Sequence, residues 1–516
     1  MTLFDLLAIR WLERPEAPAL AGDGADEGLT HGGLAAAVAA VARGLAARGL
    51  ERGDRVAFLA GNRVELAVAY LAVLRLGALV VPVNLAYRPR EVAHLFADAE
   101  PRLVVAEADR VAGLEEVPAE ARASVEAVVA LEELSRPPTG EESGSGLPGP
   151  PGGDDPALLV YTSGTTGASK GAILTHGNLL ATVTGLLAAW AWRPDDVLLL
   201  TLPLFHVHGL VVGLLTALAA GARVELRPRF DADAVAAELA APDAAEPDRR
   251  GPTLFFGVPT MYVRLLAALS RREDLSGLGR VRLFASGSAP LSPETFHAFR
   301  AATGHEIVER YGMSETGMNL SNPYAGPRRP GTVGLPLPGV SIRIVDPESE
   351  SPQLGDVGPG ESGELLVSGP NVFAGYWRDP EKTKASFVSG ADRRLWFRTG
   401  DLARRDPATG YVTLLGRRHE LVIRGGLNVY PREVEEVLER CPGVAEAAVA
   451  GRPDPEWGEV PVAWVVRAAA SETDPEILLA HCRRELAPFK VPATFHFVAE
   501  LPRNALGKVQ KHRLGR

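Results

Sequence analysis

Short apolar runs alternate with helical stretches along the first part of the chain, and this rhythm constrains the fold more than any other feature. The run at residues 55–59 predicts a strand, and residues 64–76 form a helical stretch. A second apolar run follows at residues 79–83, then a helix near residues 90–97 and a strand at residues 103–105. Strands separated by helices favour a parallel sheet covered on both faces. Further strands of this kind are predicted near residues 158–161, 197–201, 253–258 and 281–285.

The chain is long enough for more than one domain. Its 516 residues exceed what one hydrophobic core usually serves. We expect an α/β protein with a large N-terminal domain of mixed and parallel, doubly covered sheets (residues 1–417) and a small α+β C-terminal domain (residues 418–516). The elements predicted in the smaller domain are helices at residues 431–440 and 475–486 and strands at residues 445–450, 461–466 and 494–498.

The charge balance and the apolar runs exclude several classes of protein. The chain has 54 Lys and Arg residues against 64 Asp and Glu residues, whereas nucleic-acid binding needs a basic face. The longest nearly apolar run, residues 209–222, is shorter than the roughly 20 residues that a membrane span needs. Cys441 and Cys482 form neither a disulfide framework nor a zinc motif, and residues 1–5 lack the pattern of a signal peptide. We therefore expect a cytoplasmic protein without nucleic-acid partners or integral membrane association. Nothing in the sequence indicates an oligomeric state.

A loop rich in glycine and hydroxyl side chains overlaps the end of the strand predicted at residues 158–161. Residues 161–171 read YTSGTTGASKG. Glycines let backbone N–H groups approach an anion, hydroxyls add donors, and Lys170 supplies a positive charge. The loop therefore has the chemistry of a polyphosphate cradle, although it lacks the spacing of a Walker A loop. Its composition alone also allows a flexible turn.

Six segments in a fixed order resemble the adenylate-forming superfamily, which contains acyl-CoA synthetases, luciferases and peptide-synthetase adenylation domains. The loop at residues 161–171 resembles the signature phosphate loop of that superfamily. Any one segment could mislead, but the six together span nearly the whole chain. The other five are ASGSAPL at residues 285–291, ERYGMSET at 309–316, RTGD at 398–401, GRRHE at 416–420 and PRNALGK at 502–508.

The resemblance implies an ATP site formed by these segments. The loop at residues 162–170 would hold the β- and γ-phosphates, and Tyr311 would offer a flat face to adenine. Asp401 would accept hydrogen bonds from the ribose hydroxyls, and Arg417 would add a ribose or phosphate contact. Ser314 replaces the usual threonine but keeps the hydroxyl that would face the α-phosphate. The residues implied for ATP and AMP are Thr162, Ser163, Gly164, Thr165, Thr166, Gly167, Lys170, Ser288, Ala289, Pro290, Glu309, Arg310, Tyr311, Gly312, Met313, Ser314, Asp401 and Arg417.

The same resemblance implies the catalytic groups of an ATP-dependent acyl-CoA synthetase, with ATP, Mg²⁺ and coenzyme A as its cofactors and co-substrate. ATP carries about four negative charges, so its chemistry needs cations and oriented donors. Lys508 would stabilise charge as a carboxylate attacks the α-phosphorus, and Glu315 would hold Mg²⁺. His206 would act at the mouth of the acyl pocket. Considered one at a time, Lys508 and Glu315 are more simply explained as solvated surface charges.

A domain rotation completes the implied mechanism. By resemblance, one arrangement of the domains makes the adenylate, and rotation about a hinge then allows thioester formation. Gly425 and Gly426 would let the narrow pantetheine arm of coenzyme A pass, although an ordinary β-turn explains the same pair. His419 stands at the hinge, where the family usually has Asp or Lys. Since histidine titrates near neutrality, we hypothesise that the rotation depends on pH.

The segments around the acyl pocket most resemble the malonyl-CoA synthetases. Residues 313–323 and 329–334 carry this likeness, which implies malonate as the substrate and tolerance of methylmalonate. Arg264 would bind the second carboxylate bidentately, unless it is a surface arginine on the helix that follows Pro259. The residues implied at the acyl group are His206, Arg264, Ser288 and Met313.

Three alternatives to a malonate-specific synthetase stay open. The chain could activate a different short-chain, medium-chain or aromatic carboxylate. It could be a stand-alone adenylation enzyme that loads a carrier protein, or a relative that binds nucleotide without chemistry. The presence of Lys170, Glu315 and Lys508 argues against the last of these.

Overall fold

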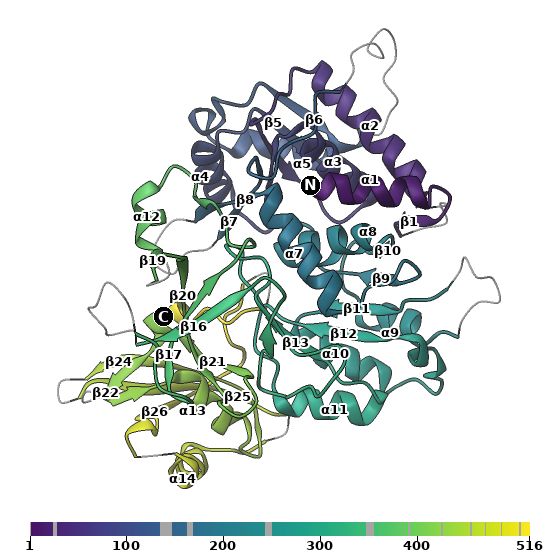
Figure 1. The fold of residues 1–516 in the computed structure, drawn as a ribbon. Helices are drawn as coiled ribbons and strands as arrows, with labels where there is room; N and C mark the ends of the chain where they lie inside the picture. The colour runs from purple at the N-terminus through teal and green to yellow at the C-terminus, as the bar shows by residue number, and fades with distance from the viewer. Residues whose placement is uncertain are drawn as a thin grey trace.

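The structure is a computed structural model, drawn as a ribbon in Figure 1. It confirms an α/β protein, in which a large N-terminal part carries three sheets and a smaller C-terminal part carries a fourth. The residues that it describes are 2–23, 28–134, 147–162, 169–242, 250–346, 355–390, 393–424, 427–454, 457–469, 471–486, 488–504 and 507–515.

The first sheet has seven strands in the order β18-β8-β7-β4-β3-β5-β6. Strands β3 to β7 pair in parallel, while β8 and β18 pair antiparallel at one edge. The predicted strand–helix rhythm of the first half is therefore confirmed. The strands are β3 (Arg55–Leu59), β4 (Leu79–Pro82), β5 (Leu103–Ala106), β6 (Ala127–Ala130), β7 (Pro156–Thr162), β8 (Lys170–Thr175) and β18 (Gly375–Tyr376).

The second sheet has nine strands in the order β15-β14-β13-β12-β11-β9-β10-β1-β2. Its central strands, from β1 to β13 in that order, pair in parallel, and short antiparallel strands extend both edges. The strands are β1 (Pro18–Ala21), β2 (Leu29–Thr30), β9 (Val197–Leu200), β10 (Arg223–Leu226), β11 (Leu254–Gly257), β12 (Leu283–Ser286), β13 (Val308–Tyr311), β14 (Leu320–Ser321) and β15 (Leu335–Pro336).

Helices cover the two large sheets and join them through one core. Helix α3 (Val64–Leu76) is buried along nearly its whole length, and a single hydrophobic cluster links it to strands of both sheets. A separate cluster packs α9, α10 and α11 against the second sheet. The remaining helices of this part are α1 (Leu3–Glu13), α2 (His31–Ala47), α4 (Pro89–Ala99), α5 (Ala108–Val111), α6 (Leu131–Leu134), α7 (His176–Ala189), α8 (Thr216–Ala220), α9 (Ala232–Ala240), α10 (Pro259–Leu269), α11 (Pro293–Thr303) and α12 (Pro380–Ala385).

A third, antiparallel sheet lies between the large sheets and the C-terminal part of the chain. The strand–helix rhythm did not predict it, because its strands follow one another without helices of comparable length. It contains β16 (Ser341–Val345), β17 (Ser362–Ser368), β19 (Phe387–Ser389), β20 (Leu395–Arg405) and β21 (Val412–Arg417).

The C-terminal part forms its own sheet and core, at the lower left of Figure 1. Its two helices and three of its five strands occupy the ranges that the sequence predicts. Strand β21 ends at Arg417 and the next strand belongs to a different sheet, while the domain boundary itself stays a prediction. The elements are β22 (Val422–Arg424), β23 (Leu427–Val429), α13 (Pro431–Glu439), β24 (Val444–Asp454), β25 (Gly458–Arg467), α14 (Pro475–Glu485) and β26 (Thr494–Val498).

Parallel strands bring distant segments to one place. Strands β11, β12 and β13 are adjacent and parallel, so the segments after Gly257, Ser286 and Tyr311 leave from the same edge of the second sheet. This edge is where α/β sheets usually hold their ligands. Within the described part of the chain, no helix is both long enough and apolar enough to cross a membrane.

Candidate active site

A cavity of about 1390 Å³ lies among the two large sheets, the third sheet and the C-terminal tail. Ten of the residues proposed from the sequence line it, although they come from segments that are far apart in the chain. The structure therefore brings the predicted phosphate, metal, acyl and lysine positions together. The ten are Lys170, His206, Ser288, Arg310, Gly312, Met313, Ser314, Glu315, Arg417 and Lys508.

Several proposed residues lie outside the described part of the structure, and their expected roles stay predictions. They are Ser163, Gly164, Thr165, Thr166 and Gly167 of the phosphate loop and Gly425 and Gly426 of the expected pantetheine passage, together with the side chains of Thr162 and His419.

Lys170, which the sequence assigns to the phosphates, lines the cavity at the start of β8. Its Nζ lies 3.1 Å from Oδ2 of Asp379, and both side chains are partly exposed. Asp379 also caps helix α12, because its Oδ1 accepts a hydrogen bond from the backbone N–H of Lys382 at 2.9 Å. A cation is thus held in the lining of the cavity by a charge that phosphate oxygens could replace.

Glu315 supplies a buried carboxylate to the cavity. Its Oε1 accepts a hydrogen bond from the Tyr376 hydroxyl at 3.1 Å, and burial raises the pKa of Glu315 above its ordinary value. Among the described residues, no three His, Cys, Asp or Glu side chains converge as a metal site. A single carboxylate in the lining suits Mg²⁺, which binds one or two carboxylates and completes its shell with substrate phosphates and water.

Asp401 and Arg417 face each other across β20 and β21. Arg417 Nε lies 2.6 Å from Asp401 Oδ1, and the Tyr311 hydroxyl donates a hydrogen bond to the other carboxylate oxygen. Asp401 and Tyr311 are buried and do not line the cavity, whereas Arg417 does. Arg417 is therefore the member of this group that a nucleotide in the cavity can reach directly.

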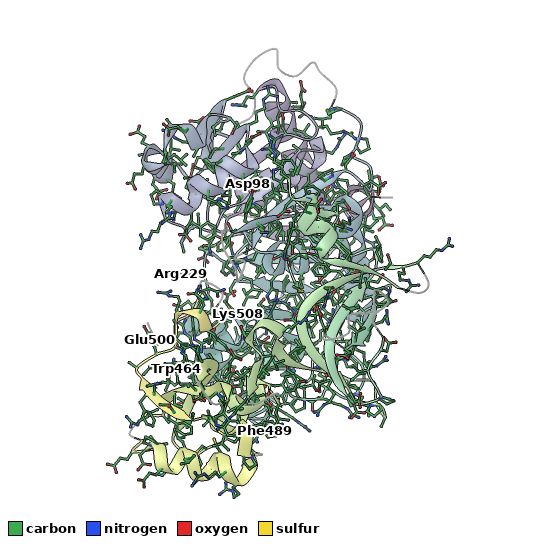
Figure 2. The ribbon with its side chains drawn as sticks, turned by 90° about the vertical axis from the view of Figure 1, so that its left-hand side faces the viewer. Asp98, Arg229, Trp464, Phe489, Glu500 and Lys508 are labelled. Atoms are coloured by element: carbon green, nitrogen blue, oxygen red, sulfur yellow. The ribbon has the colours of Figure 1, made fainter. Side chains whose placement is uncertain are left out.

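Lys508 stands in a tight turn of the C-terminal tail. Figure 2 labels it where the yellow C-terminal ribbon meets the body of the molecule. Its backbone N–H donates to Asn504 Oδ1 at 2.9 Å, and its carbonyl accepts from the Asn504 backbone N–H at 2.9 Å. Loss of hydration in the cavity and the nearby Arg417 guanidinium lower the pKa of Lys508. Both effects make the ammonium ready to pair with an incoming anion.

The neighbouring Gly507 allows the tail to lie close to helix α10 of the N-terminal part. Its φ of +76° is a left-handed value that glycine adopts without strain. A Cβ at this position would lie 3.2 Å from Thr260 Oγ1 on α10. The tail is thus packed against the start of α10 in the arrangement that directs Lys508 at the cavity.

The lining of the cavity also contains two histidines and a serine. Nδ1 of His208 lies 3.1 Å from Ser288 Oγ, and Ser288 adopts a left-handed φ of +70°. Burial lowers the pKa of His206 to about 4, and burial, Arg310 and His206 together lower that of His208. Both rings are therefore neutral at pH 7. No described residue gives a hydrogen-bond partner to the Nε2 atom of either ring.

Arg310 is a further cation in the lining of the cavity. Its side chain is only 5% exposed, yet its Nε and Nη2 atoms have no hydrogen-bond partner among the described residues. Burial lowers the pKa of Arg310 to about 9. Gly287 leaves room for this side chain, because a Cβ there would lie 2.5 Å from the guanidinium carbon and would force it to shift. A buried guanidinium with free donors is costly to fold and is well suited to bind an anion.

Arg264 lies apart from the residues that line the cavity. Its side chain is exposed on α10, and the guanidinium lies 5.4 Å from the ring centroid of Phe230. This position favours the alternative interpretation of a surface arginine. Arg310, which the sequence had assigned to the nucleotide, is a buried cation in the lining of the cavity.

Glu309, Ala289 and Pro290 also do not line the cavity. Glu309 is buried, and its Oε1 accepts a hydrogen bond from the backbone N–H of Leu291 at 3.0 Å. It therefore holds the segment beside the cavity in place rather than contacting a ligand from within it. Burial raises the pKa of Glu309 from 4.5 to about 8.

The raised pKa of Glu309 predicts how stability varies with pH. Between pH 4.5 and about 8 the unfolded chain loses this proton while the folded chain keeps it, so the contribution of Glu309 to stability falls as pH rises. We expect Glu309→Gln to gain at least about 1 kcal/mol in unfolding free energy relative to wild type between pH 5 and pH 8. Urea unfolding at both pH values measures this, with the exposed Glu116→Gln as the control. If the unfolding free energies of wild type and both variants change by the same amount between the two pH values, the raised pKa of Glu309 is contradicted.

The residues that line the cavity but were not proposed from the sequence include His208, Tyr376 and Asp379. His208 had a signal, because it stands two positions after His206 and begins the π-helix His208–Leu215, a rare form that is common near functional sites. Tyr376 and Asp379 have no motif of their own and reach the site only because β18 pairs with β8.

Comparisons with known proteins identify the family of this chain. The profile of the AMP-binding enzyme family matches residues 8–377, and that of the AMP-binding enzyme C-terminal domain matches residues 433–508. A sulfoacetate–CoA ligase of Cupriavidus necator is 38% identical over 99% of this chain and 97% of its own. The mitochondrial malonate–CoA ligase ACSF3 of Mus musculus is 38% identical over 89% of this chain and 81% of its own.

A solved structure gives the same result for the fold. The crystal structure of ATP-bound MatB from Rhodopseudomonas palustris has a TM-score of 0.89 and is 40% identical, covering 99% of this chain and 98% of that one.

Proposed function

Since this chain belongs to the AMP-binding enzyme family, we propose that it uses ATP to activate a small carboxylic acid with a second anionic group, malonate above all, and transfers the acyl group to coenzyme A. The chain is an acid–thiol ligase of the AMP-forming type. The choice of malonate, the tolerance of methylmalonate and the use of Mg²⁺ are the parts that this proposal adds.

The proposed reaction has two steps. In the first, a carboxylate oxygen attacks the α-phosphorus of ATP, the bond from that phosphorus to the bridging oxygen breaks, and pyrophosphate leaves. In the second, the sulfur of coenzyme A attacks the acyl carbon, a C–S bond forms, AMP leaves with the carboxyl oxygen, and the thiol proton passes to solvent. Lys508 and Lys170 lie where they can stabilise the charges of the first step. The second step requires the C-terminal domain to rotate about the hinge near residue 419.

Mg²⁺ fits the donors in the cavity. Glu315 would hold the ion together with phosphate oxygens, and the ion would neutralise charge on the leaving pyrophosphate. Arg417 would contact the ribose or the α-phosphate from the wall formed by the third sheet.

The guanidinium of Arg310 is the observation that carries the choice of substrate, because it is buried and its Nε and Nη2 atoms have no hydrogen-bond partner among the described residues. A monocarboxylate whose only carboxylate points at the α-phosphate would leave Arg310 without a counter-charge. A substrate with a second anionic group would pair with it and, through neutral His206 or His208, would gain further hydrogen bonds. Malonate has this second group one carbon away from the reacting carboxylate.

Sulfoacetate is the second candidate for the same reason. It carries a sulfonate where malonate carries its second carboxylate, and a relative named for it is similar to this chain over nearly the full length of both. A guanidinium pairs with either group. We favour malonate because a planar carboxylate matches the bidentate fork of arginine. An added methyl group changes pocket binding by only about 1–3 kcal/mol, which is consistent with turnover of methylmalonate.

A pyrophosphate-release assay with ATP, Mg²⁺ and coenzyme A tests the proposal across malonate, methylmalonate, sulfoacetate, propionate, acetate, octanoate and benzoate. Propionate is the matched control, because it has the length of malonate without the second carboxylate. We expect kcat/KM for malonate to exceed that for propionate by at least about 100-fold. A preference for sulfoacetate would change the acid but keep the dianion proposal. A preference for octanoate or benzoate would refute it, and detection of free acyl-CoA excludes an enzyme that loads a carrier protein.

A further inference from the structure

A second lysine of the C-terminal tail, Lys511, is buried and paired although the proposed reaction assigns it no role. Its Nζ lies 2.6 Å from Oε1 of Glu435 and 3.4 Å from Oε2 of Glu420. The Lys511 side chain is 16% exposed and that of Glu435 is 8% exposed. An ammonium group clamped between two carboxylates stands three residues after Lys508.

The two carboxylates belong to different parts of the C-terminal domain. Glu435 lies on α13, and its Oε1 also accepts a hydrogen bond from the backbone N–H of Val449 on β24 at 2.8 Å. Glu420 lies in the short turn between β21 and β22, where the chain passes from the third sheet into the C-terminal sheet. Lys511 therefore ties the tail to the helix, and to the segment that the sequence identifies as the hinge.

The turn that carries Lys508 is fixed from both sides. On its N-terminal side, Arg503 Nη2 lies 2.8 Å from Glu446 Oε2 on β24. Within the turn, Asn504 bonds to both backbone groups of Lys508. On its C-terminal side, backbone contacts of the tail and the clamp at Lys511 both hold the turn. A change at Lys511 therefore weakens one of the two ends of this turn.

The charge of Lys511 is retained in the fold. Burial alone would lower its pKa, but Glu435 and Glu420 outweigh this effect, and the pKa of Lys511 lies above its ordinary value. A buried ammonium is tolerated only where its carboxylates are within reach, so the clamp favours the observed position of the tail. In this position Lys508 lines the cavity.

We propose that Lys511 is a positioning residue, which holds Lys508 at the α-phosphate and thereby serves adenylate formation and not thioester formation. The inference rests on the two-step function proposed above. In the first step charge changes at the phosphorus that Lys508 faces, whereas in the second the attack is at the acyl carbon. Loss of the clamp should therefore slow adenylate formation and leave thioester formation nearly unchanged.

The test compares Lys511→Met with Lys490→Met in the full-length protein. Lys490 is the matched control, because its Nζ lies 2.6 Å from Glu433 on the same helix α13 and its side chain is 21% exposed, but it does not belong to the tail. Adenylate formation is measured as acid-dependent ATP–pyrophosphate exchange without coenzyme A. Thioester formation is measured with synthetic acyl-adenylate and coenzyme A.

We expect Lys511→Met to slow pyrophosphate exchange on the order of tenfold, since small misplacements of a catalytic group are costly. Thioester formation in this variant, and both half-reactions in Lys490→Met, should stay within about twofold of wild type. Lys511→Arg keeps the charge and should restore most of the exchange rate. Equal losses in both half-reactions of Lys511→Met, or the same loss in Lys490→Met, would overturn the inference.

Glu420→Gln keeps the test decisive if Lys511→Met folds poorly. This variant weakens the longer contact of the clamp and leaves the 2.6 Å pair with Glu435 intact. It should lower the ratio of adenylation to thioester rates in the same direction by a smaller factor, and an unchanged ratio would refute the clamp. All variants are assayed with the acid that wild type uses best. If the wild-type enzyme prefers another acid, malonate is refuted as the substrate, but the two half-reactions of the Lys511 variants can still be compared.

Discussion

Lys508→Met is expected to reduce adenylate formation by about 10²–10³-fold, the usual loss when one preorganised group that stabilises transition-state charge is removed. Lys508 lines the cavity next to Arg417, and partial loss of hydration lowers its pKa. Its interaction with an anion is therefore stronger than it would be in bulk water. Methionine keeps much of the side-chain volume and removes the charge, so the packing of the turn should persist.

The half-reactions and two controls make this prediction specific. Pyrophosphate exchange should collapse in Lys508→Met, while synthetic acyl-adenylate should still be converted to acyl-CoA. Lys490→Met, which removes a paired lysine elsewhere in the same domain, should retain both activities. The thermal unfolding temperatures of all variants should lie close to that of wild type. A Lys508→Met protein that exchanges pyrophosphate at the wild-type rate would remove the lysine from the first step.

The sequence predicts the elements of the fold well where local pattern and tertiary environment agree. The buried strands β3, β4 and β5 are short apolar runs, and the all-round burial of α3 matches its continuous apolar sequence. The third sheet escaped prediction because β20 mixes buried and charged positions and contains Gly400 with a left-handed φ. Its pairing with β17 and β21 depends on contacts between residues that are far apart in the chain, which the local hydrophobic pattern does not predict.

The motifs locate the site but do not assign each side chain. Arg264 lies on the helix that follows β11, Arg310 lies within β13, and the sequence assigned Arg264 to the acyl group and Arg310 to the nucleotide. The outcome depends on the direction of each side chain, since Arg264 points outward from α10 and Arg310 is buried within β13. Direction relative to a neighbouring element is tertiary information. A resemblance between motifs predicts the position of a residue near the site more reliably than it predicts which atoms its side chain contacts.

The same reasoning explains why Asp401 and Tyr311 are found near the site without lining it. A motif records that they are close to the nucleotide position, but the ion pair of Asp401 with Arg417 forms only when β20 pairs with β21. The pair leaves Arg417 at the wall of the cavity, with Asp401 engaged by two partners.

Arg310→Met is the variant that should separate substrate recognition from stability most clearly. It removes a buried guanidinium whose Nε and Nη2 atoms have no partner among the described residues. We expect the unfolding free energy to rise by about 1–3 kcal/mol, because an unpaired buried polar group is replaced by an apolar one. We expect kcat/KM for malonate to fall by about 10²–10³-fold, since truncating one partner of a buried charge pair costs about 2–5 kcal/mol. Turnover of propionate should not fall with it, because propionate has no second carboxylate to lose.

Arg264→Met is the matched control, because it removes an arginine that lies outside the cavity on the exposed face of α10. Steady-state kinetics with malonate and propionate and urea unfolding are measured for both variants. Arg264→Met should stay within about twofold of wild type in kcat/KM and within about 0.5 kcal/mol in stability. If malonate turnover is lost in Arg264→Met and kept in Arg310→Met, the exposed arginine reaches the substrate after all, and the buried guanidinium serves only the fold. If Arg310→Met becomes both more stable and indifferent to the second carboxylate, Arg310 is the group that selects a dianionic acid at a cost in folding stability.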